Sequence, residues 1–325
     1  LHFQVGDIAA LPTPELGEVR SHITNTRVLI ATAARDWDAY ERSWDFQSLP
    51  LLTASSEPTP TLESSYTAWI TQNKGTIAEM KRLEEENNRL FIDAYGLADE
   101  LTPDVPIEQI TLTVNPAYRY GGKLTEEEQW TRFRQDTMEE LVSYAIGCMM
   151  GRYSLDAPGL IYAHSGNEGF DPTQYTTFPA DDDNVIPIVD GEWFTDDIVA
   201  RCKEFLKVTW GTENYEQNLR WLEDGLYPKN ATAKTRKTLR DYFLKDFYKS
   251  HISTYKKRPI YWMFSSPKGT FNALIYLHRY RPDTVSVILN DYLREFQTKL
   301  ASKADHLQTV ADSGDSSKTE KAIAI

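Results

Sequence analysis

The stretch LESSYTAWITQNKGTIAEMKRLEEENNRLFIDAY, residues 62–95, places large side chains at alternating spacings of three and four residues. This spacing puts them on one face of an α-helix, in the pattern of a coiled-coil seam. Thr61 is suited to cap the start of this helix and Gly96 its end. At 1.5 Å per residue the helix would be about 50 Å long, longer than a small domain is wide. Its seam comprises Leu62, Tyr66, Trp69, Thr76, Met80, Leu83, Leu90 and Ala94, with Asn73 and Asn87 as polar interruptions.

A similar seam lies earlier in the chain, and only Thr26 breaks its spacing. A Pro- and Ser-rich break over residues 48–60 separates the two seams. Two long helices joined in this way predict an antiparallel hairpin that holds other modules at a fixed separation. The alternative is that both seams face an ordinary globular core. The residues of the earlier seam are Val19, Ile23, Ile30, Ala33, Trp37, Tyr40 and Trp44.

Further elements follow from cap, turn and periodicity signals. Thr125 and Glu128 form a capping box at the start of a helix that would stop at Gly151. The Gly-, Pro- and Asp-rich stretch up to Asp190 predicts loop or short strand. Asp283 is suited to cap a last helix, and the chain beyond about Ser302 is polar and expected to fray. We also expect helices over residues 196–210, 213–222 and 235–251, and a β-hairpin of residues 260–266 and 271–277 joined by residues 267–270.

The composition limits the classes of protein. The 325 residues are 41% hydrophobic and 12% aromatic, which is enough to bury a core. The formal net charge of −13 argues against coating nucleic acid or an anionic membrane with the whole surface. Cys148 and Cys202 form no paired metal or redox spacing, so a reducing cytoplasm is the simplest interpretation. No apolar run approaches the roughly 18 residues that a membrane helix requires.

One segment departs from the acidic balance of the chain. Between Lys229 and Arg258 ten Lys or Arg stand against Asp241 and Asp246, a net charge of +8. Such segregation predicts a local footprint for nucleic-acid phosphates, and the turn residue of the nearby hairpin extends it. The alternative is an ordinary solvated helix face. The candidate phosphate contacts are Lys234, Arg236, Lys237, Arg240, Lys256, Lys257, Arg258 and Lys268.

Two shorter motifs resemble sites that carry chemistry in other proteins. Asn115-Pro116-Ala117-Tyr118 follows the strand-like run of residues 110–114 and partly matches the Asn/Asp-Pro-Pro-aromatic loop with which amino-methyltransferases hold a flipped adenine. A cofactor-binding strand and Gly-rich turn are missing upstream, which favours a turn in which Tyr118 and Tyr120 pack on neighbours. The acidic run at residues 181–184 lacks the spacing of an ion-binding loop and is expected to be a solvated or partner-facing turn.

Seven blocks of sequence carry a family resemblance. Together they resemble the carboxy-terminal part of the PglX-type adenine-specific DNA methyltransferases of bacteriophage-exclusion (BREX) systems, which are akin to type II restriction-modification methylases. The match extends from Val5 to about Leu300. The blocks are DWD (36–38), SWDF (43–46), EEENNRL (84–90), GCMMGRYSLD (147–156), DDDNVIP (181–187), KRPIYWMFSSPKG (257–269) and LNDYLREF (289–296).

The resemblance implies that a parent protein methylates adenine N6 in host DNA with S-adenosylmethionine. In that family the catalytic domain precedes the matching region, so no catalytic, cofactor or metal residue is expected in this chain. The resemblance implies a DNA-engaging and scaffolding role, with duplex DNA and other BREX defence subunits as partners in the cytoplasm. The alternative function is a protein-interaction platform whose acidic surface and loop 181–183 dock those subunits or mimic DNA.

The predicted fold is therefore a mostly helical α+β structure, in which a long antiparallel, spacer-like helical hairpin precedes a helical domain with a small β-hairpin. Residues 1–17 would be the exit of a target-recognition module and residues 18–96 the helical spacer. Residues 97–302 would form the helical domain, with the hairpin at 259–278. Residues 303–325 would be a frayed or disordered tail.

Overall fold

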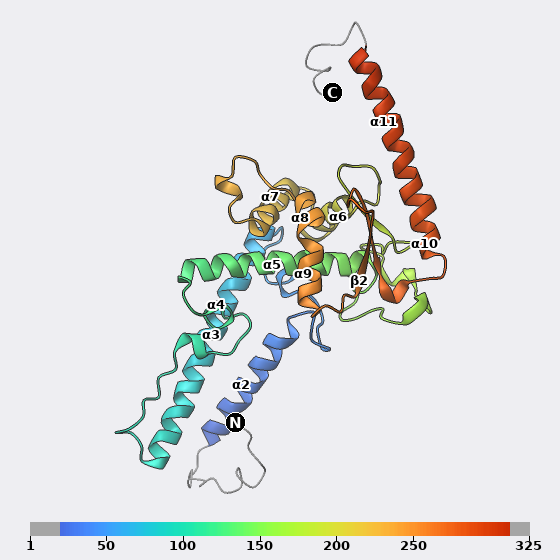
Figure 1. The fold of residues 1–325 in the computed structure, drawn as a ribbon. Coiled ribbons are helices and arrows are strands. Elements are labelled where there is room, and N and C mark those ends of the chain that lie inside the picture. Colours follow the sequence, from blue (N-terminus) through green and yellow to red (C-terminus); the bar gives the residue numbers. More distant parts are fainter. Residues whose placement is uncertain (1–19, 313–325) are drawn as a thin grey trace. The chain divides into compact units, whose positions relative to one another are not determined.

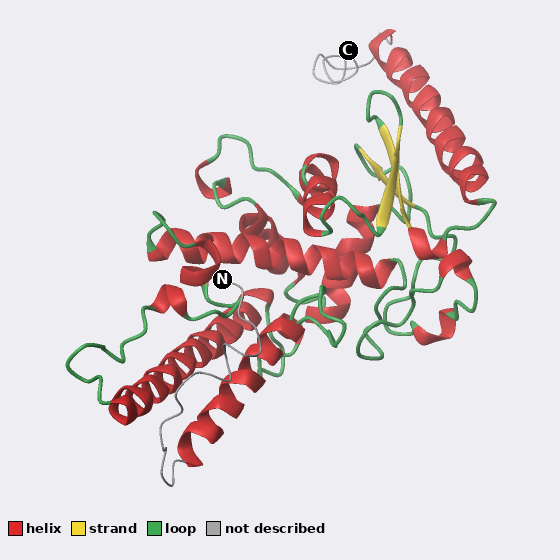
Figure 2. Ribbon diagram, turned by 60° about the horizontal axis from the view of Figure 1, so that its bottom comes forward, coloured by secondary structure: helices red, strands yellow, loops and turns green. Residues whose placement is uncertain are grey.

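The computed structural model of the chain describes residues 20–312. They fall into two compact units, one of residues 20–57 and 64–133 and one of residues 58–63 and 134–312. Helices dominate and the strands form one small sheet, so the predicted mostly helical α+β class is confirmed (Figure 1, Figure 2). The module predicted for residues 1–17 lies outside the described residues. Among the described helices, none combines the length and the apolar character needed to cross a membrane.

Two antiparallel helices, α2 (Arg20–Asp38) and α3 (Leu62–Tyr95), dominate the first unit (Figure 1). Helix α3 has the bounds that its seam predicts. Gly96 ends it with a φ of 66°, and the N–H of Leu97 donates to the carbonyl of Ile92 at 2.9 Å. This is the closure of a Schellman motif, in which a residue without a side chain adopts the left-handed conformation.

The seam of α3 faces a small core rather than only another helix. Trp69, Ile77 and Met80 are buried in one cluster with residues of the segment that follows α3, and Leu29 and Ala33 of α2 pack against that cluster. The hairpin therefore exists, but part of its apolar face is covered by an irregular segment. The residues of that segment are Val105, Ile110, Leu112 and Val114.

The strand predicted before Asn115 does not form. Residues 110–114 have no strand partner, and the N–H groups of Thr113 and Val114 donate to the carboxylate of Asp36 at 2.6 and 3.0 Å. A buried backbone donor needs a partner, and here a side chain supplies what a neighbouring strand would have supplied. The apolar, β-branched composition of the run reflects its burial.

Helix α5 (Glu126–Met149) contributes its residues up to Phe133 to the first unit and the remainder to the second. Its capping box is confirmed, since the N–H of Thr125 donates to the Glu128 carboxylate at 2.8 Å and the N–H of Glu128 to the Thr125 hydroxyl at 3.3 Å. The other helices of the second unit are α6 (Ile198–Trp210), α7 (Tyr215–Leu226), α8 (Leu239–Lys245), α9 (Phe247–Thr254), α10 (Thr284–Val287) and α11 (Arg294–Asp312).

The helix predicted over residues 235–251 is two helices. Thr238 and Asp241 form a capping box that delays the start of α8 to Leu239. Asp246 lies between α8 and α9, and its carboxylate accepts a hydrogen bond from the hydroxyl of Tyr227 at 2.8 Å. These polar contacts with the backbone and with α7 override the continuous helical pattern.

The sheet has the order β1-β3-β2, with all strands antiparallel: β1 (Ile186–Val189), β2 (Tyr261–Ser265) and β3 (Phe271–Tyr276). The predicted hairpin is confirmed, with Tyr261 opposite Tyr276. On one face, Phe271 and Ile275 pack against Tyr292 and Phe296 of the last helical segment.

That segment continues from α10 through a π-helical stretch, Ile288–Leu293, into α11. The predicted loss of structure after Ser302 differs from what is observed, because α11 continues to Asp312 and extends away from the sheet (Figure 2). Residues 303–312 are mostly exposed, but Ala, Leu, Gln and Lys among them have high helix propensity.

Candidate nucleic-acid interface

The eight predicted phosphate contacts all lie in the second unit, and they divide by what their side chains already bind. The side chain of Arg240, on α8, is bound by other residues of the second unit. Its guanidinium donates to both carboxylate oxygens of Asp197 at 2.9 Å and to the carbonyl of Val189 at 2.6 Å. Asp197 is fully buried and also caps α6, so this is a buried ion pair that ties α8, α6 and β1 together.

Arg236 and Lys237 are also engaged. Arg236 is 2.7 Å from a carboxylate oxygen of Asp224 and donates to the carbonyl of Arg220 at 3.1 Å. The ammonium of Lys237 lies 4.6 Å from the centre of the Tyr227 ring, a cation–π contact. These side chains fasten the loop before α8 onto α7. The sequence could not show this, because the acidic and aromatic partners lie on another helix.

Five of the eight side chains are exposed and make neither an ion pair nor a cation–π contact within residues 20–312. Lys234 lies in the loop before α8, and Lys268 lies at the tip of the β2–β3 hairpin. The others form the α9–β2 turn, which we define as Lys256, Lys257 and Arg258.

The α9–β2 turn has an unusual backbone. Lys256 and Lys257 have φ values of 50° and 65°, and the N–H of Lys257 donates to the carbonyl of Ile252 at 2.8 Å. Two successive non-glycine residues in the left-handed region carry a conformational cost, which is commonly tolerated at functional sites. The result is three adjacent cations on a fixed turn rather than on a flexible tail.

The predicted continuous basic patch of this turn and Lys268 does not form, because the sheet separates them. The α9–β2 turn precedes β2, and Lys268 follows it, so the two lie at opposite ends of a five-residue strand. That strand is about 17 Å long. The α9–β2 turn and Lys268 therefore lie at opposite ends of the hairpin, and Lys234 lies apart from both in the loop before α8.

The Asn115 motif plays a structural role in the first unit. Asn115 is 1% exposed and caps the short helix α4 (Pro116–Tyr120) by accepting from the N–H of Ala117 at 3.2 Å. Its amide donates to the carbonyls of Ile107 and Ile110 at 2.7 and 2.8 Å. All its polar atoms are therefore engaged, which supports the turn interpretation. Tyr118 is 48% exposed, contrary to the expected packing.

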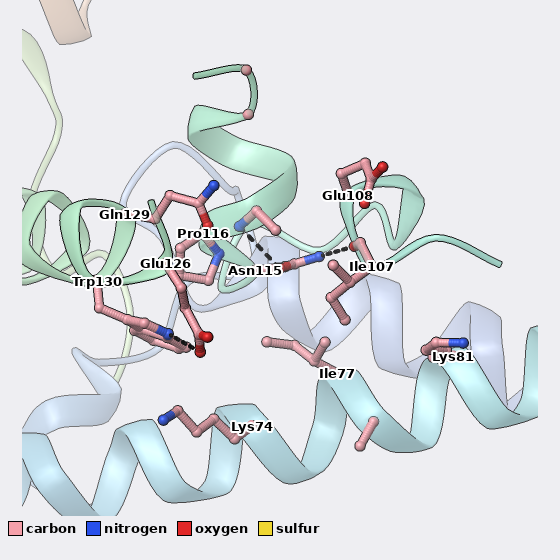
Figure 3. A pocket seen from close by; sticks show the side chains of 14 residues that line it. Lys74, Ile77, Lys81, Ile107, Glu108, Asn115, Pro116, Glu126, Gln129 and Trp130 are labelled. Atoms are coloured by element: carbon pink, nitrogen blue, oxygen red, sulfur yellow. Dashed lines mark hydrogen bonds between the residues drawn. The ribbon is translucent and has the colours of Figure 1, made fainter. Parts of the chain in front are cut away.

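A cavity of about 670 Å³ lies beside this motif (Figure 3). Trp130 and Lys74 face each other across it, with the ammonium 4.9 Å from the ring centre. The described residues do not fit S-adenosylmethionine, because the sheet is antiparallel and no Gly-rich turn joins a strand to a helix as dinucleotide and nucleoside sites require.

The acidic run is not the solvated turn that its composition predicts. Asp181 and Asp183 both accept from the N–H of Val185, at 3.1 and 2.8 Å. Burial, together with the charge of Asp183, raises the pKa of Asp181 to about 8. The hydroxyl of Tyr292 lies 2.9 Å from Asp183 and 2.7 Å from Asp196, so these carboxylates fasten the loop to the last helical segment. No carboxylate, imidazole and thiol cluster of the described residues is arranged to hold a metal ion.

The chain is homologous to a segment of adenine-specific methyltransferases. It is 36% identical over 323 residues to the adenine-specific methyltransferase BrxX of Escherichia coli O9:H4 (strain HS), an alignment covering 96% of this chain and 26% of that protein. It is 35% identical over 323 residues to the adenine-specific methyltransferase PglX of Lacticaseibacillus casei (strain Zhang), covering 95% of this chain and 24% of that protein. The resemblance expected from the sequence blocks is thus confirmed.

The chain spans about a quarter of the length of the curated relatives it matches. No protein-family model matches it.

Proposed function

We propose that this chain is a duplex-DNA-binding brace within a site-specific adenine-N6 methyltransferase of BREX phage defence, which uses S-adenosylmethionine at a site outside residues 20–312. The observation that carries the proposal is the set of five exposed cations that make no ion pair or cation–π contact within residues 20–312 of an acidic chain. Three of them stand together on the α9–β2 turn. The similarity to two adenine-specific methyltransferases over nearly the whole chain gives these cations a nucleic-acid context.

Phosphate contacts suit a brace because they fix the orientation of a protein on the duplex without reading sequence. A methyltransferase extrudes its target base into a pocket, and this requires the duplex to stay in register with the catalytic site. The α9–β2 turn and Lys268, about 17 Å apart at the two ends of β2, would contact phosphates several nucleotides apart. The acidic remainder of the surface confines binding to these groups.

Charge reversal of the α9–β2 turn tests the proposal. We expect the triple variant Lys256→Glu, Lys257→Glu, Arg258→Glu to bind both cognate and random duplex at least about tenfold more weakly at low salt, since phosphate contacts are independent of sequence. Fluorescence anisotropy with labelled duplexes measures the affinity.

A matched control changes the same total charge in the first unit. It is the triple variant Arg27→Glu, Arg89→Glu, Lys123→Glu, at three exposed positions. We expect its loss of affinity to be small compared with that of the turn variant. Equal losses in both variants, or none in either, would remove the turn from the proposed interface.

A second candidate function, the docking of another defence subunit, is favoured by one observation. Helix α2 exposes Ile23, Ile30 and Trp37, seven residues apart and 48%, 65% and 54% exposed, while its opposite face packs on the core. A helix that is apolar on two faces usually has a partner on each. The double variant Ile30→Lys, Trp37→Lys should then abolish co-purification of BREX subunits and leave DNA affinity unchanged.

A further inference from the structure

Arg152, just after α5, is a partly buried cation without an acidic partner. Its Nε donates to the hydroxyl of Tyr153 at 3.0 Å, and one terminal nitrogen donates to the hydroxyl of Tyr276 at 3.3 Å. Both partners are tyrosine hydroxyls and not carboxylates. Within residues 20–312 no carboxylate forms an ion pair with it, and its other terminal nitrogen makes no hydrogen bond. A partly buried guanidinium with an unused donor can bind an anion.

Arg279 shows what a purely structural arginine looks like in the same unit. It is 2% exposed, and all three guanidinium nitrogens are engaged. Their acceptors are the side-chain oxygen of Asn167 and the carbonyls of Met150 and Asp182, at 3.1 to 3.3 Å. Its charge also lies 3.7 Å from the centre of the Phe170 ring. Arg152 lacks such a complete set of acceptors, which leaves part of its planar fork available to a ligand.

A buried, neutral histidine adds a hydrogen-bond donor to this region. His251 is 4% exposed, and its Nε2 accepts from the backbone N–H of Tyr261 at 3.2 Å. The neutral ring therefore carries its proton on Nδ1, which has no hydrogen-bond partner in the described part of the chain. Burial, with the nearby charge of Arg152, lowers the pKa of His251 to about 4. The imidazole thus presents a donor and no negative group to its surroundings.

These groups are connected to the α9–β2 turn by a continuous series of rings. Neighbouring ring centres are 4.9 to 5.5 Å apart along the series. Its first member, Tyr255, directly precedes Lys256 in the chain. The buried cation and the exposed cations therefore belong to one end of the β2–β3 hairpin. The series runs Tyr255, His251, Tyr261, Tyr276 and His278.

We propose that Arg152 is an anion-binding residue that holds one phosphate group, with the lysines of the α9–β2 turn as the outer part of the same site. The planar guanidinium matches the oxygens of a phosphate, and Arg is favoured over Lys where this geometry matters. The inference deepens the proposed function, because a DNA phosphodiester is one source of that phosphate. The terminal phosphate of a free nucleotide is the other.

Titration of the chain with inorganic phosphate, by calorimetry or by phosphorus NMR, tests the site directly. We expect inorganic phosphate to bind saturably to the unaltered chain. Arg152→Met should weaken this binding at least about tenfold, because it removes a charge-assisted hydrogen bond to the phosphate. Arg152→Lys should retain part of the affinity, since it keeps the charge but not the fork. The control is Arg201→Met, which removes an arginine that lies 4.5 Å from the Phe178 ring but is already paired with Glu204.

Absence of saturable phosphate binding to the unaltered chain would overturn the site, whatever the variants do. Equal binding by Arg152→Met and the unaltered chain would do the same. Displacement of phosphate by a short duplex would identify the DNA backbone as the source. Displacement by deoxyadenosine monophosphate but not by duplex would keep the site and assign it to a free nucleotide. If phosphate binds while the charge-reversed turn leaves duplex affinity unchanged, the brace function fails and the Arg152 site stands.

Discussion

The guanidinium of Arg240 lies 2.9 Å from each carboxylate oxygen of Asp197, in an ion pair whose carboxylate is fully buried. Arg240 lies in the most basic segment of the chain, but its guanidinium is paired with Asp197 and links α8 to the start of α6. The cations of this segment thus divide into those that stabilise the fold and those that face solvent. Each group has a different expected response to mutation.

Replacing Arg240 should damage the fold. We expect Arg240→Met to lower the free energy of unfolding by about 3–5 kcal/mol, because it leaves the Asp197 carboxylate buried without its partner. Urea denaturation measures the change. Lys245→Met is the control, since its pair with Asp241 is exposed and worth at most about 1 kcal/mol. A stable Arg240→Met variant with weakened DNA binding would instead return Arg240 to the interface.

Two glycines inside helices should respond to alanine with opposite signs. A Cβ on Gly225 of α7 would lie 2.4 Å from Cγ of Met138, whereas a Cβ on Gly75 of α3 would meet nothing within 4 Å. We expect Gly225→Ala to destabilise by about 1–3 kcal/mol through overpacking. Gly75→Ala should stabilise by about 0.5–1 kcal/mol through its helix propensity. Thermal denaturation of both variants checks this pair, and a shared sign would contradict it.

Asn115 should behave as a cap and not as a catalytic group. Asn115→Ala leaves the carbonyls of Ile107 and Ile110 without their donor, so we expect a loss of about 2–3 kcal/mol. Hydrogen exchange of residues 105–120 should accelerate. The control is Gln129→Ala, which lines the same cavity but makes only one 3.3 Å contact with Leu124. Unchanged exchange in Asn115→Ala would argue against the structural role.

The stability of the second unit should fall as the pH rises from about 4 towards 8. The pKa of Asp181 is raised to about 8 in the folded chain by burial and by Asp183, while an unfolded Asp titrates near 3.9. Between these values the folded state binds the proton and the unfolded state does not, so the free energy of unfolding declines by at most about 1.4 kcal/mol per pH unit. The decline is complete above the folded pKa.

Asp181→Asn tests this pH dependence. The amide keeps an acceptor for the N–H of Val185 and removes the titration, so the variant should show a flatter profile and greater stability than the unaltered chain at pH 8. Asp182→Asn, at the exposed neighbouring position, should leave the profile as it was. A variant with the original slope would show that Asp181 is not the titrating group.

Much of the fold could be predicted because its signals are local. The seam of α3 and the left-handed Gly96 define one helix, and Thr125 with Glu128 defines the start of another. The β2–β3 hairpin follows from two β-rich runs and a Pro-Lys-Gly turn.

The remaining features depend on partners distant in sequence. The apolar run at residues 110–114 predicts a strand, but the carboxylate of Asp36 takes the place of a neighbouring strand. Likewise, the net charge of a segment does not show which of its cations form ion pairs. The pairs of Arg240 with Asp197 and of Arg236 with Asp224 can be identified only in the folded structure. Arg152 was not predicted as a site residue. The signal for it in the sequence is a lone arginine within the apolar stretch of residues 147–156.

The salt dependence of duplex binding tests the central claim most directly. Each phosphate contact lowers the slope of log K against log salt by about 0.9. Measured by anisotropy with a random-sequence duplex, the variant with Lys256, Lys257 and Arg258 all changed to Glu should have a slope shallower by about two to three than the unaltered chain. An identical slope in the two proteins would contradict a phosphate-binding role for the α9–β2 turn.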